Sequence, residues 1–256
     1  MGADLRDLLR QHGFTPFNAE RWSNFVQHVL KLFQDAADTL RQQENWESFK
    51  QKKGALGVAQ KRKRQKIIQR VPIEDAITSE LSHFVQRARR AVSKTHFLRL
   101  NEVEFLAEFL VPSTTLAGRH SRKVDFYVCS SVGEGAPELA IEAKPIVTKG
   151  DISGRYLAKE GIGCFLTEDP PYTRGPLGAM LAYTISNTGH SWRTEVRAAV
   201  SVYQPKALQL EDVRIEGAQE PLIFSRHERG ALGLGPIAVL HLEMIFTPDI
   251  QGTVEL

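Results

Sequence analysis

The sequence has little of what marks several large classes of protein. It has two cysteines in 256 residues, Cys129 and Cys164, and neither has a Cys or His neighbour at metal-binding spacing. This argues against a disulfide framework and a zinc site, and we interpret both as small buried residues in a reducing compartment. No run reaches the roughly 18 apolar residues of a membrane span, and the start, MGADLRDLLR, lacks the apolar core of a signal peptide. We therefore expect a cytoplasmic protein with no membrane partner.

The sequence also lacks a charge imbalance, an internal repeat and a nucleotide-binding Walker motif. Thirty-three Lys and Arg oppose thirty Asp and Glu, for a net charge of +3, so the total says little about partners. The distribution is uneven, because residues 51–70 contain no acidic residue. Such a run is typical of a solvated linker, of an arm that contacts nucleic-acid phosphates, or of a docking segment for a partner. Its basic residues are Lys52, Lys53, Lys61, Arg62, Lys63, Arg64, Lys66 and Arg70.

What is present is enough apolar sequence to form a core, since 42% of the residues are hydrophobic. Residues 1–70 are predicted to be a helical N-terminal extension with a basic linker, and residues 71–256 the main domain. Two helices are expected in the extension, at 3–13 with a Gly13 cap and at 19–49. We interpret the second as a structural cap on the main domain, with a docking or dimerisation surface as the alternative.

The main domain mixes helical and strand-like patterns, which predicts an α/β fold with a mixed central sheet flanked by helices. Strands are expected at 101–111, 123–131, 138–145, 162–167, 197–204, 221–228 and 236–246, and helices at 72–92, 151–161 and 175–187.

The stretch ELAIEAKP, residues 138–145, is unusual because it carries charge inside an apolar strand. Side chains alternate between the faces of a strand, so Glu142 and Lys144 share one face. Asp125 lies on the preceding strand and can sit beside them if the two strands pair as a hairpin. Glu74 and Glu80 fall near the two edges of the apolar stripe of helix 72–92. Either carboxylate could reach a site under this helix.

These residue types point to metal-assisted phosphodiester hydrolysis. Close carboxylates repel each other unless a cation neutralises them. Mg²⁺ suits hard oxygen ligands, lowers the pKa of a bound water and stabilises charge on a scissile phosphate. Lys144 could orient the attacking water or stabilise the transition state.

In this order the residues resemble the PD-(D/E)XK nuclease superfamily, which has the restriction-endonuclease-like fold. The resemblance covers roughly residues 72 to 170. It implies that Asp125 and Glu142 bind Mg²⁺ or Mn²⁺, that Lys144 assists catalysis, and that Glu74 completes the metal site, with Glu80 as the alternative. Val124 stands where the proline of the family motif is usually written.

Segments such as RYLAKEGIGCFL and AVLHLEMIF are similar to nucleases of prokaryotic antiphage and restriction loci. This implies a DNA-cutting effector of a bacterial defence system, working beside a helicase or ATPase subunit, with a homodimer also compatible. The first alternative is a non-catalytic nucleic-acid-binding or scaffold subunit with a nuclease-like fold. A phosphatase-like or RNA-directed hydrolase is a third interpretation.

Other polar residues have both a structural and a functional interpretation. His241 alternates with apolar residues and is interpreted as a core histidine, whereas His227 could contact a phosphate. Neither enters the predicted catalytic set. Tyr156, Lys159 and Arg174 follow the Glu142 strand and could line the same cleft.

Overall fold

A mixed eight-stranded sheet forms the centre of the molecule, in the spatial order β1-β8-β9-β10-β7-β6-β5-β4. The structure, a computed structural model, describes residues 2–62, 67–113, 116–215 and 221–253. β4, β5 and β6 form an antiparallel meander, and β6, β7 and β10 are parallel. The predicted α/β class with a mixed central sheet is confirmed. The strands are β1 (Ala3–Asp4), β4 (Val103–Leu110), β5 (Lys123–Ser130), β6 (Glu138–Ile146), β7 (Leu177–Ile185), β8 (Gln209–Arg214), β9 (Leu222–Arg229) and β10 (Leu234–Phe246).

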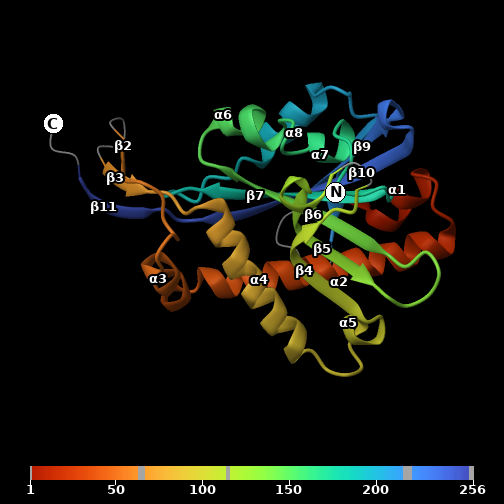
Figure 1. Cartoon of the computed structure of the whole chain (residues 1–256), viewed down its shortest axis with the longest axis horizontal. Coiled ribbons are helices and arrows are strands. Elements are labelled where there is room, and N and C mark those ends of the chain that lie inside the picture. The colour runs from red at the N-terminus through yellow and green to blue at the C-terminus, as the bar shows by residue number, and fades with distance from the viewer. Residues whose placement is uncertain (1, 63–66, 114–115, 216–220, 254–256) are drawn as a thin grey trace.

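Helices cover both faces of this sheet (Figure 1). One hydrophobic cluster joins the first helices of the chain to one face, and a second joins the later helices to the opposite face. The first layer contains α1 (Leu5–Gln11), α2 (Pro16–Arg41), α3 (Gln43–Gln51), α4 (Glu74–Ala91) and α5 (Phe97–Leu100). The second contains α6 (Lys149–Asp151), η3 (Ile152–Tyr156), α7 (Gly163–Leu166) and α8 (Arg193–Val202), and two further short helices are η2 (Gly118–His120) and η4 (Gly230–Leu232).

The helix α2 has a sequence that explains both its start and its buried face. Thr15 accepts a hydrogen bond from the backbone N–H of Asn18, and Pro16 occupies the first turn, where its missing N–H costs nothing. Its aromatic and aliphatic residues recur at helical spacing and are buried in the first cluster. The expected helix 19–49 is in fact two helices, because the backbone leaves the helical conformation at Gln42.

The first 70 residues share the core of the rest of the chain. Residues of α2 belong to the same hydrophobic cluster as those of α4, β5 and β6. The division at residues 70 and 71 remains a prediction from the charge run, and the packing puts both sides of it in one core.

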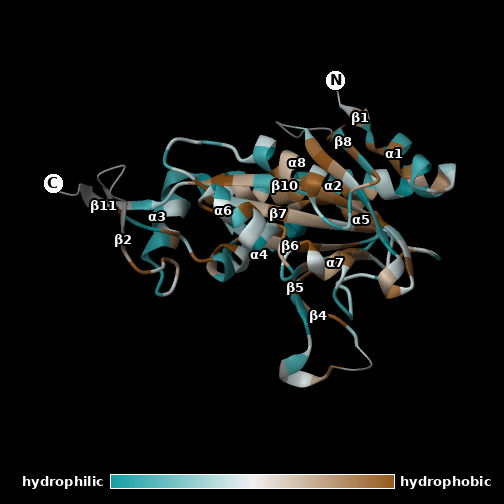
Figure 2. Ribbon diagram, turned by 90° about the horizontal axis from the view of Figure 1, so that it is seen from above, coloured by the Kyte–Doolittle hydropathy of each residue, from teal (hydrophilic) through white to brown (hydrophobic). Residues whose placement is uncertain are grey.

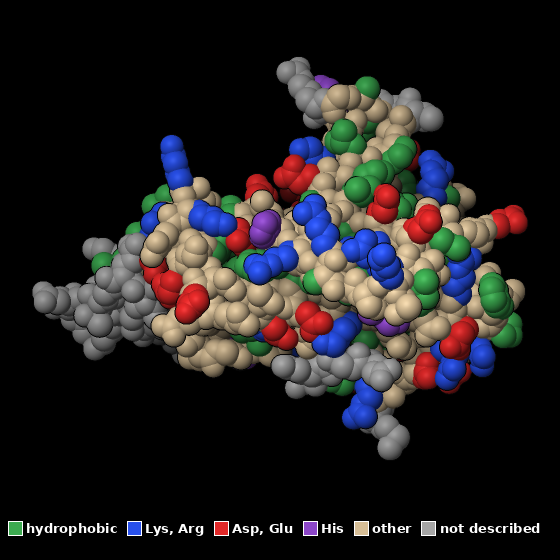
Figure 3. Space-filling model, turned by 90° about the horizontal axis from the view of Figure 1, so that it is seen from below, with side chains coloured by type: hydrophobic (Ala, Val, Ile, Leu, Met, Phe, Trp, Pro, Cys, Tyr) green, Lys and Arg blue, Asp and Glu red, His purple; other side chains and the backbone are tan. Residues whose placement is uncertain are grey.

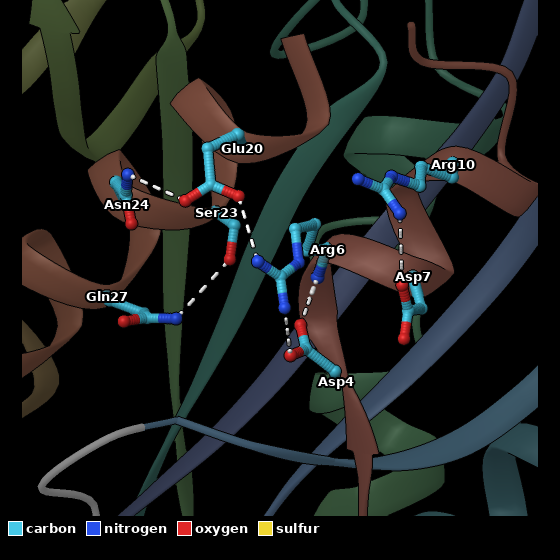
Figure 4. A network of polar contacts seen from close by, with 8 residues as sticks. All are labelled: Asp4, Arg6, Asp7, Arg10, Glu20, Ser23, Asn24 and Gln27. Atoms are coloured by element: carbon cyan, nitrogen blue, oxygen red, sulfur yellow. Dashed lines mark hydrogen bonds and ion pairs between the residues drawn. The ribbon is translucent and has the colours of Figure 1, made fainter. Parts of the chain in front are cut away.

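Polar contacts also connect α1 to α2 (Figure 4). Arg6 donates to Glu20 at 3.0 Å and to Asp4 at 3.1 Å. These side chains are solvent-exposed, so each pair contributes at most about 1 kcal/mol. Apolar packing therefore accounts for most of the attachment of α1.

The basic run contributes to a second, three-stranded sheet that the sequence did not predict. This small sheet has the order β11-β3-β2 and contains β2 (Gln60–Arg62), β3 (Ile67–Arg70) and β11 (Asp249–Thr253). Figure 2 shows it extending from one end of the molecule. Lys63, Arg64 and Lys66 lie outside the described residues. The predicted linker is thus partly an ordered antiparallel hairpin.

Three predicted elements are wrong in type. Residues 175–187 contain β7 rather than a helix, because a strand buried on both faces is continuously apolar and shows no alternation. Most of residues 197–204 belong to α8, which ends at Val202, rather than to a strand, and Val196 and Val200 are buried one turn apart. The predicted strand 162–167 is α7, all four residues of which are buried.

The face of the molecule in Figure 3 gives no simple indication of a partner. On the face in Figure 3, basic and acidic side chains are both spread over the surface. Among the described residues, no helix combines the length and the apolar character needed to span a bilayer.

Candidate active site

The charged side of β6 lies next to the second core cluster. Leu139, Ile141 and Ala143 pack in the first cluster, and Ala140 packs in the second. Strand alternation therefore places Glu142 and Lys144 on the side of Ala140, as the sequence predicted. Parallel pairing with β7 on the other side holds this part of β6 in the centre of the sheet.

Asp125 lies on β5, directly across from Glu142. The antiparallel register pairs Phe126 with Ile141, and one step further along the two strands brings Asp125 opposite Glu142. The Asp125 side chain accepts a 2.7 Å hydrogen bond from the backbone N–H of Ala143. This bond holds the carboxylate of Asp125 against β6, next to Glu142.

Glu74 is the first residue of α4, which packs on the first-cluster face of the sheet, and its side chain reaches Lys144. Thr78, one turn later, lies 3.1 Å from the hydroxyl of Tyr183 on β7, so the first turn of α4 is held against the sheet. Glu80 instead pairs with Lys52 of the segment before the small sheet. The structure brings Glu74 to the site and not Glu80.

Together these residues form a compact cluster of three carboxylates and one ammonium group. One oxygen from each of Glu74, Asp125 and Glu142 lies within 4.8 Å of the other two. Lys144 Nζ is 2.6 Å from an oxygen of Glu74 and 2.6 Å from an oxygen of Glu142. The four predicted residues therefore meet in space, and their catalytic and metal-binding roles stay predictions.

One carboxylate oxygen in the cluster has no protein partner. Glu142 is 4% exposed, and its Oε2 is buried without a hydrogen bond. An unpaired buried oxygen on a charged group costs free energy that a bound cation would offset. Three hard oxygen donors at this spacing fit the ligand preference of Mg²⁺ or Mn²⁺.

The pKa values of the cluster also indicate that its negative charges are not fully balanced by the protein. Burial raises the pKa of Asp125 to about 6, against the lowering effect of Lys144. Burial, together with the charge of Asp125, raises the pKa of Glu142 well above its ordinary value. Burial opposes the charged form of Lys144, but Glu142 and Glu74 outweigh it and raise its pKa. One lysine does not balance three carboxylates, so a further cation would stabilise the ionised site.

A cleft of about 490 Å³ opens beside Glu142 and Lys144. Lys159, which the sequence predicted as a cleft residue, lines it, and Arg174 does not. Tyr156 is fully buried and faces the core instead, so its predicted place in the cleft is wrong. The chain turns sharply after Lys159 at Gly161, where an added Cβ would lie 2.2 Å from the carbonyl oxygen of Tyr156.

The two histidines lie away from this cleft. His227 is 0% exposed and its Nδ1 is 3.0 Å from the carbonyl of Pro205. Its burial makes the phosphate-contact alternative wrong. His241 is also buried, which agrees with the interpretation as a core histidine.

Sequence reasoning missed five residues that line the cleft: Arg122, Glu160, Cys164, Glu168 and Tyr172, of which Arg122 and Glu168 form an ion pair. These two are 46 positions apart and come from the start of β5 and the segment after α7. No local spacing connects them, and a prediction of α7 as a strand hid the position of Glu168. Only the packed structure shows this pair.

Comparison of the chain with family models, with curated proteins and with solved structures finds no match in any of the three. The case for a function therefore depends on the geometry of the site and on the resemblance of its motif residues.

Proposed function

We propose that the chain is a Mg²⁺-dependent nuclease that hydrolyses phosphodiester bonds of DNA. The observation that carries the proposal is the convergence of three carboxylates and a lysine from three separate elements at one place beside β6. Along the chain they follow the order helix with Glu74, strand with Asp125, strand with Glu142 and Lys144. This order supports the restriction-endonuclease-like fold to which the sequence has its resemblance.

Each residue has a task that its position supports. Glu74, Asp125 and Glu142 would hold the metal ion, Mg²⁺ or Mn²⁺, which when bound supplies an activated water and charge stabilisation at the scissile phosphate. Lys144 presents a compact ammonium group beside two of these ligands, where it can orient the water or contact the phosphate. The hydrogen bond from Ala143 fixes Asp125, and contact with the sheet fixes Glu74.

The small sheet supports a path for DNA toward this site. Residues Val71 and Pro72 follow β3 directly and line a hollow of about 500 Å³ together with Glu74 and Arg155. The described end of the basic run, residues 67–70, therefore leads into the molecule on the Glu74 side of the cluster. Arg70 itself donates to the carbonyl oxygens of Leu56 and Gly57, and contact of the other basic residues of the run with backbone phosphates is proposed from the sequence.

The wider role is supported by the sequence resemblance alone. It is that of a cytoplasmic effector nuclease in a bacterial antiphage or restriction system, with a helicase or ATPase subunit as partner and a homodimer as one assembly. The alternative is a non-catalytic nucleic-acid-binding or scaffold subunit. Such a subunit has no need of an unpartnered carboxylate oxygen buried beside two other acids, so the cluster favours the enzyme.

The test is cleavage of supercoiled plasmid by the purified full-length protein. We expect cutting with Mg²⁺ or Mn²⁺, none in EDTA, and none by Asp125→Asn or Glu142→Gln. Calorimetric titration should show one Mn²⁺ site in the parent and its loss in both variants. Glu211→Gln, an exposed change on β8, serves as the matched control and should behave as the parent.

Two results would contradict the proposal. Cutting by Glu142→Gln at the parent rate would exclude this site. Mn²⁺ binding without cutting of DNA would favour the alternatives, which parallel assays on RNA and on p-nitrophenyl phosphate separate.

A further inference from the structure

The cleft beside the cluster has a second charged group on its wall. Besides Glu142 and Lys144, its charged lining residues are Arg122, Lys159, Glu160 and Glu168, and Cys164 and Tyr172 complete the wall. Arg122 comes just before β5, Lys159 follows η3, and Glu168 follows α7. Arg122 thus meets Lys159 and Glu168, two residues nine positions apart, around one opening.

Glu168 holds the two cations of this group. Arg122 donates to Glu168 Oε2, and Lys159 Nζ lies 3.2 Å from Glu168 Oε1. Glu168 is 9% exposed, whereas the Lys159 side chain is 76% exposed. Each oxygen of one buried carboxylate therefore anchors a different cation, and one of the two cations reaches into solvent. Arg122, Lys159 and Glu168 together carry a net charge of +1 when ionised, and Glu160 on the same cleft offsets it.

This arrangement matches what a nucleic-acid strand needs on either side of a cut. A strand with one phosphate at Glu142 and Lys144 carries further phosphates through the same cleft, each with a negative charge. Arginine binds phosphate with two donors in a fixed fork, and lysine binds it as a mobile point charge. An arginine and a lysine brought together by one acid can rearrange around an incoming phosphate without unfolding any element.

We propose that Arg122 and Lys159 bind a backbone phosphate next to the scissile one, and that Glu168 neutralises and holds the two cations until nucleic acid enters. The proposal rests on the proposed nuclease function, because it assigns the neighbouring phosphate of the same substrate. Arg122 and Lys159 are then substrate-binding residues, and Glu168 is a positioning residue that competes with the phosphate.

Lys159→Gln is the first variant because the exposed side chain can be changed without disturbing the fold. Lys94→Gln is the matched control. Lys94 is also exposed and lies beyond the far end of α4, about 27 Å along the helix from Glu74 at 1.5 Å per residue. Both are made in the full-length chain, in the cutting-deficient Glu142→Gln background for binding and in the parent background for cleavage.

The measurement is the affinity for a labelled 30-nucleotide DNA, single-stranded and duplex, in Mg²⁺ over a series of salt concentrations. Loss of one phosphate contact should weaken binding by roughly five- to tenfold. It should also reduce the slope of log affinity against log salt by about 0.7 for single-stranded or 0.9 for duplex DNA. Lys94→Gln should change neither quantity. Glu168→Gln should act in the opposite direction and tighten binding, because it frees two cations for the phosphate.

The possible outcomes separate this proposal from the nuclease assignment. If the protein cuts DNA but the Lys159→Gln and Lys94→Gln variants bind DNA equally well, only the proposed phosphate site is overturned. If the protein does not cut DNA but binds it with the expected dependence on Lys159, the nuclease assignment is overturned and the phosphate site is supported. A parent that binds neither DNA overturns both, and weaker binding by Glu168→Gln overturns the competing role of that carboxylate.

Discussion

Two groups of polar side chains lie against the same central sheet, one partly and one fully buried, and they differ in how completely their hydrogen-bonding groups are paired. One is the candidate site on β5 and β6, with Glu74 from α4. The other lies on β9 and β10 and contains Ser225, His227 and His241, with Tyr156 from η3. We call the second group the histidine network.

The histidine network is complete. The His227 Nδ1 faces the carbonyl oxygen of Pro205 at 3.0 Å and so must donate to it. Its Nε2 then accepts from Ser225 at 2.9 Å, Ser225 accepts from His241 Nε2 at 2.8 Å, and His241 Nδ1 accepts from Tyr156 at 3.0 Å. One choice of tautomers thus gives every one of these atoms a partner. Burial, and next the proximity of His227, lowers the pKa of His241 to about 3, so the network is neutral.

The candidate site is charged and incomplete. It has three carboxylates for one lysine, and Glu142 keeps an oxygen with no partner. Burial alone does not distinguish Glu142 from the histidine network, since Glu142 is also nearly inaccessible, whereas Glu74, Asp125 and Lys144 are partly buried. A buried polar group in which every donor and acceptor has a partner stabilises the fold. One whose negative charges exceed its positive charges indicates a binding site for a cation.

The largest expected effect comes from removing the cation of the candidate site. Lys144→Met should lower the rate of DNA cleavage on the order of 10³-fold, equivalent to about 4 kcal/mol, because the scissile phosphate loses its nearest protein cation. Gel assays of plasmid cutting under single-turnover conditions measure this loss. Mn²⁺ binding should persist, since all three carboxylates remain.

The contrast with the histidine network provides the control. Ser225→Ala should leave the cleavage rate per folded molecule within about twofold of the parent, because Ser225 is 0% exposed and outside the cleft. If Ser225→Ala abolished cutting in a folded protein, the division into a structural and a functional group would be wrong.

The sequence was sufficient to predict the candidate site because its residues are tied to local patterns. Alternation in β6 put Glu142 and Lys144 on one face, and a short turn made pairing with the Asp125 strand the simplest arrangement. The choice of Glu74 over Glu80 agrees with the structure, yet the amphipathic pattern of α4 placed both near an edge of the buried stripe. What distinguishes them is the Lys52 contact of Glu80, which no local pattern contains.

The fold was less predictable where tertiary packing overrides local preference. β7 reads as a helix because its residues are apolar on both faces, as expected between two helical layers. The small sheet joins residues 60–70 to residues 249–253, near the opposite end of the chain. Long-range pairing of this kind leaves no signal in a short window of sequence.

The second effect is on stability and belongs to the histidine network. His241→Phe removes the central member and leaves Ser225 and Tyr156 each with one partner fewer, so we expect the free energy of unfolding to fall by about 2–3 kcal/mol. Urea unfolding followed by circular dichroism measures this change at pH 7.5. His83→Phe, on the exposed side of α4, is the control and should change stability by less than about 0.5 kcal/mol. Equal effects of the two substitutions would show that the histidine network does not stabilise the fold more than an exposed histidine does.

The smallest expected effect is the pH dependence of the difference in unfolding free energy between the parent and His241→Phe. His241 has a pKa of about 3 in the folded protein and about 6.5 when unfolded, so between these values the unfolded chain binds the extra proton. The folded parent therefore loses stability as the pH falls below 6.5, by about 2 kcal/mol between pH 7.5 and pH 5 from this group. His241→Phe has no such proton to bind, so the gap between parent and variant should shrink by that amount over the same range. A gap that stays constant would mean that His241 is protonated inside the network, and a charged network would no longer stand as the neutral counterpart of the site on β6.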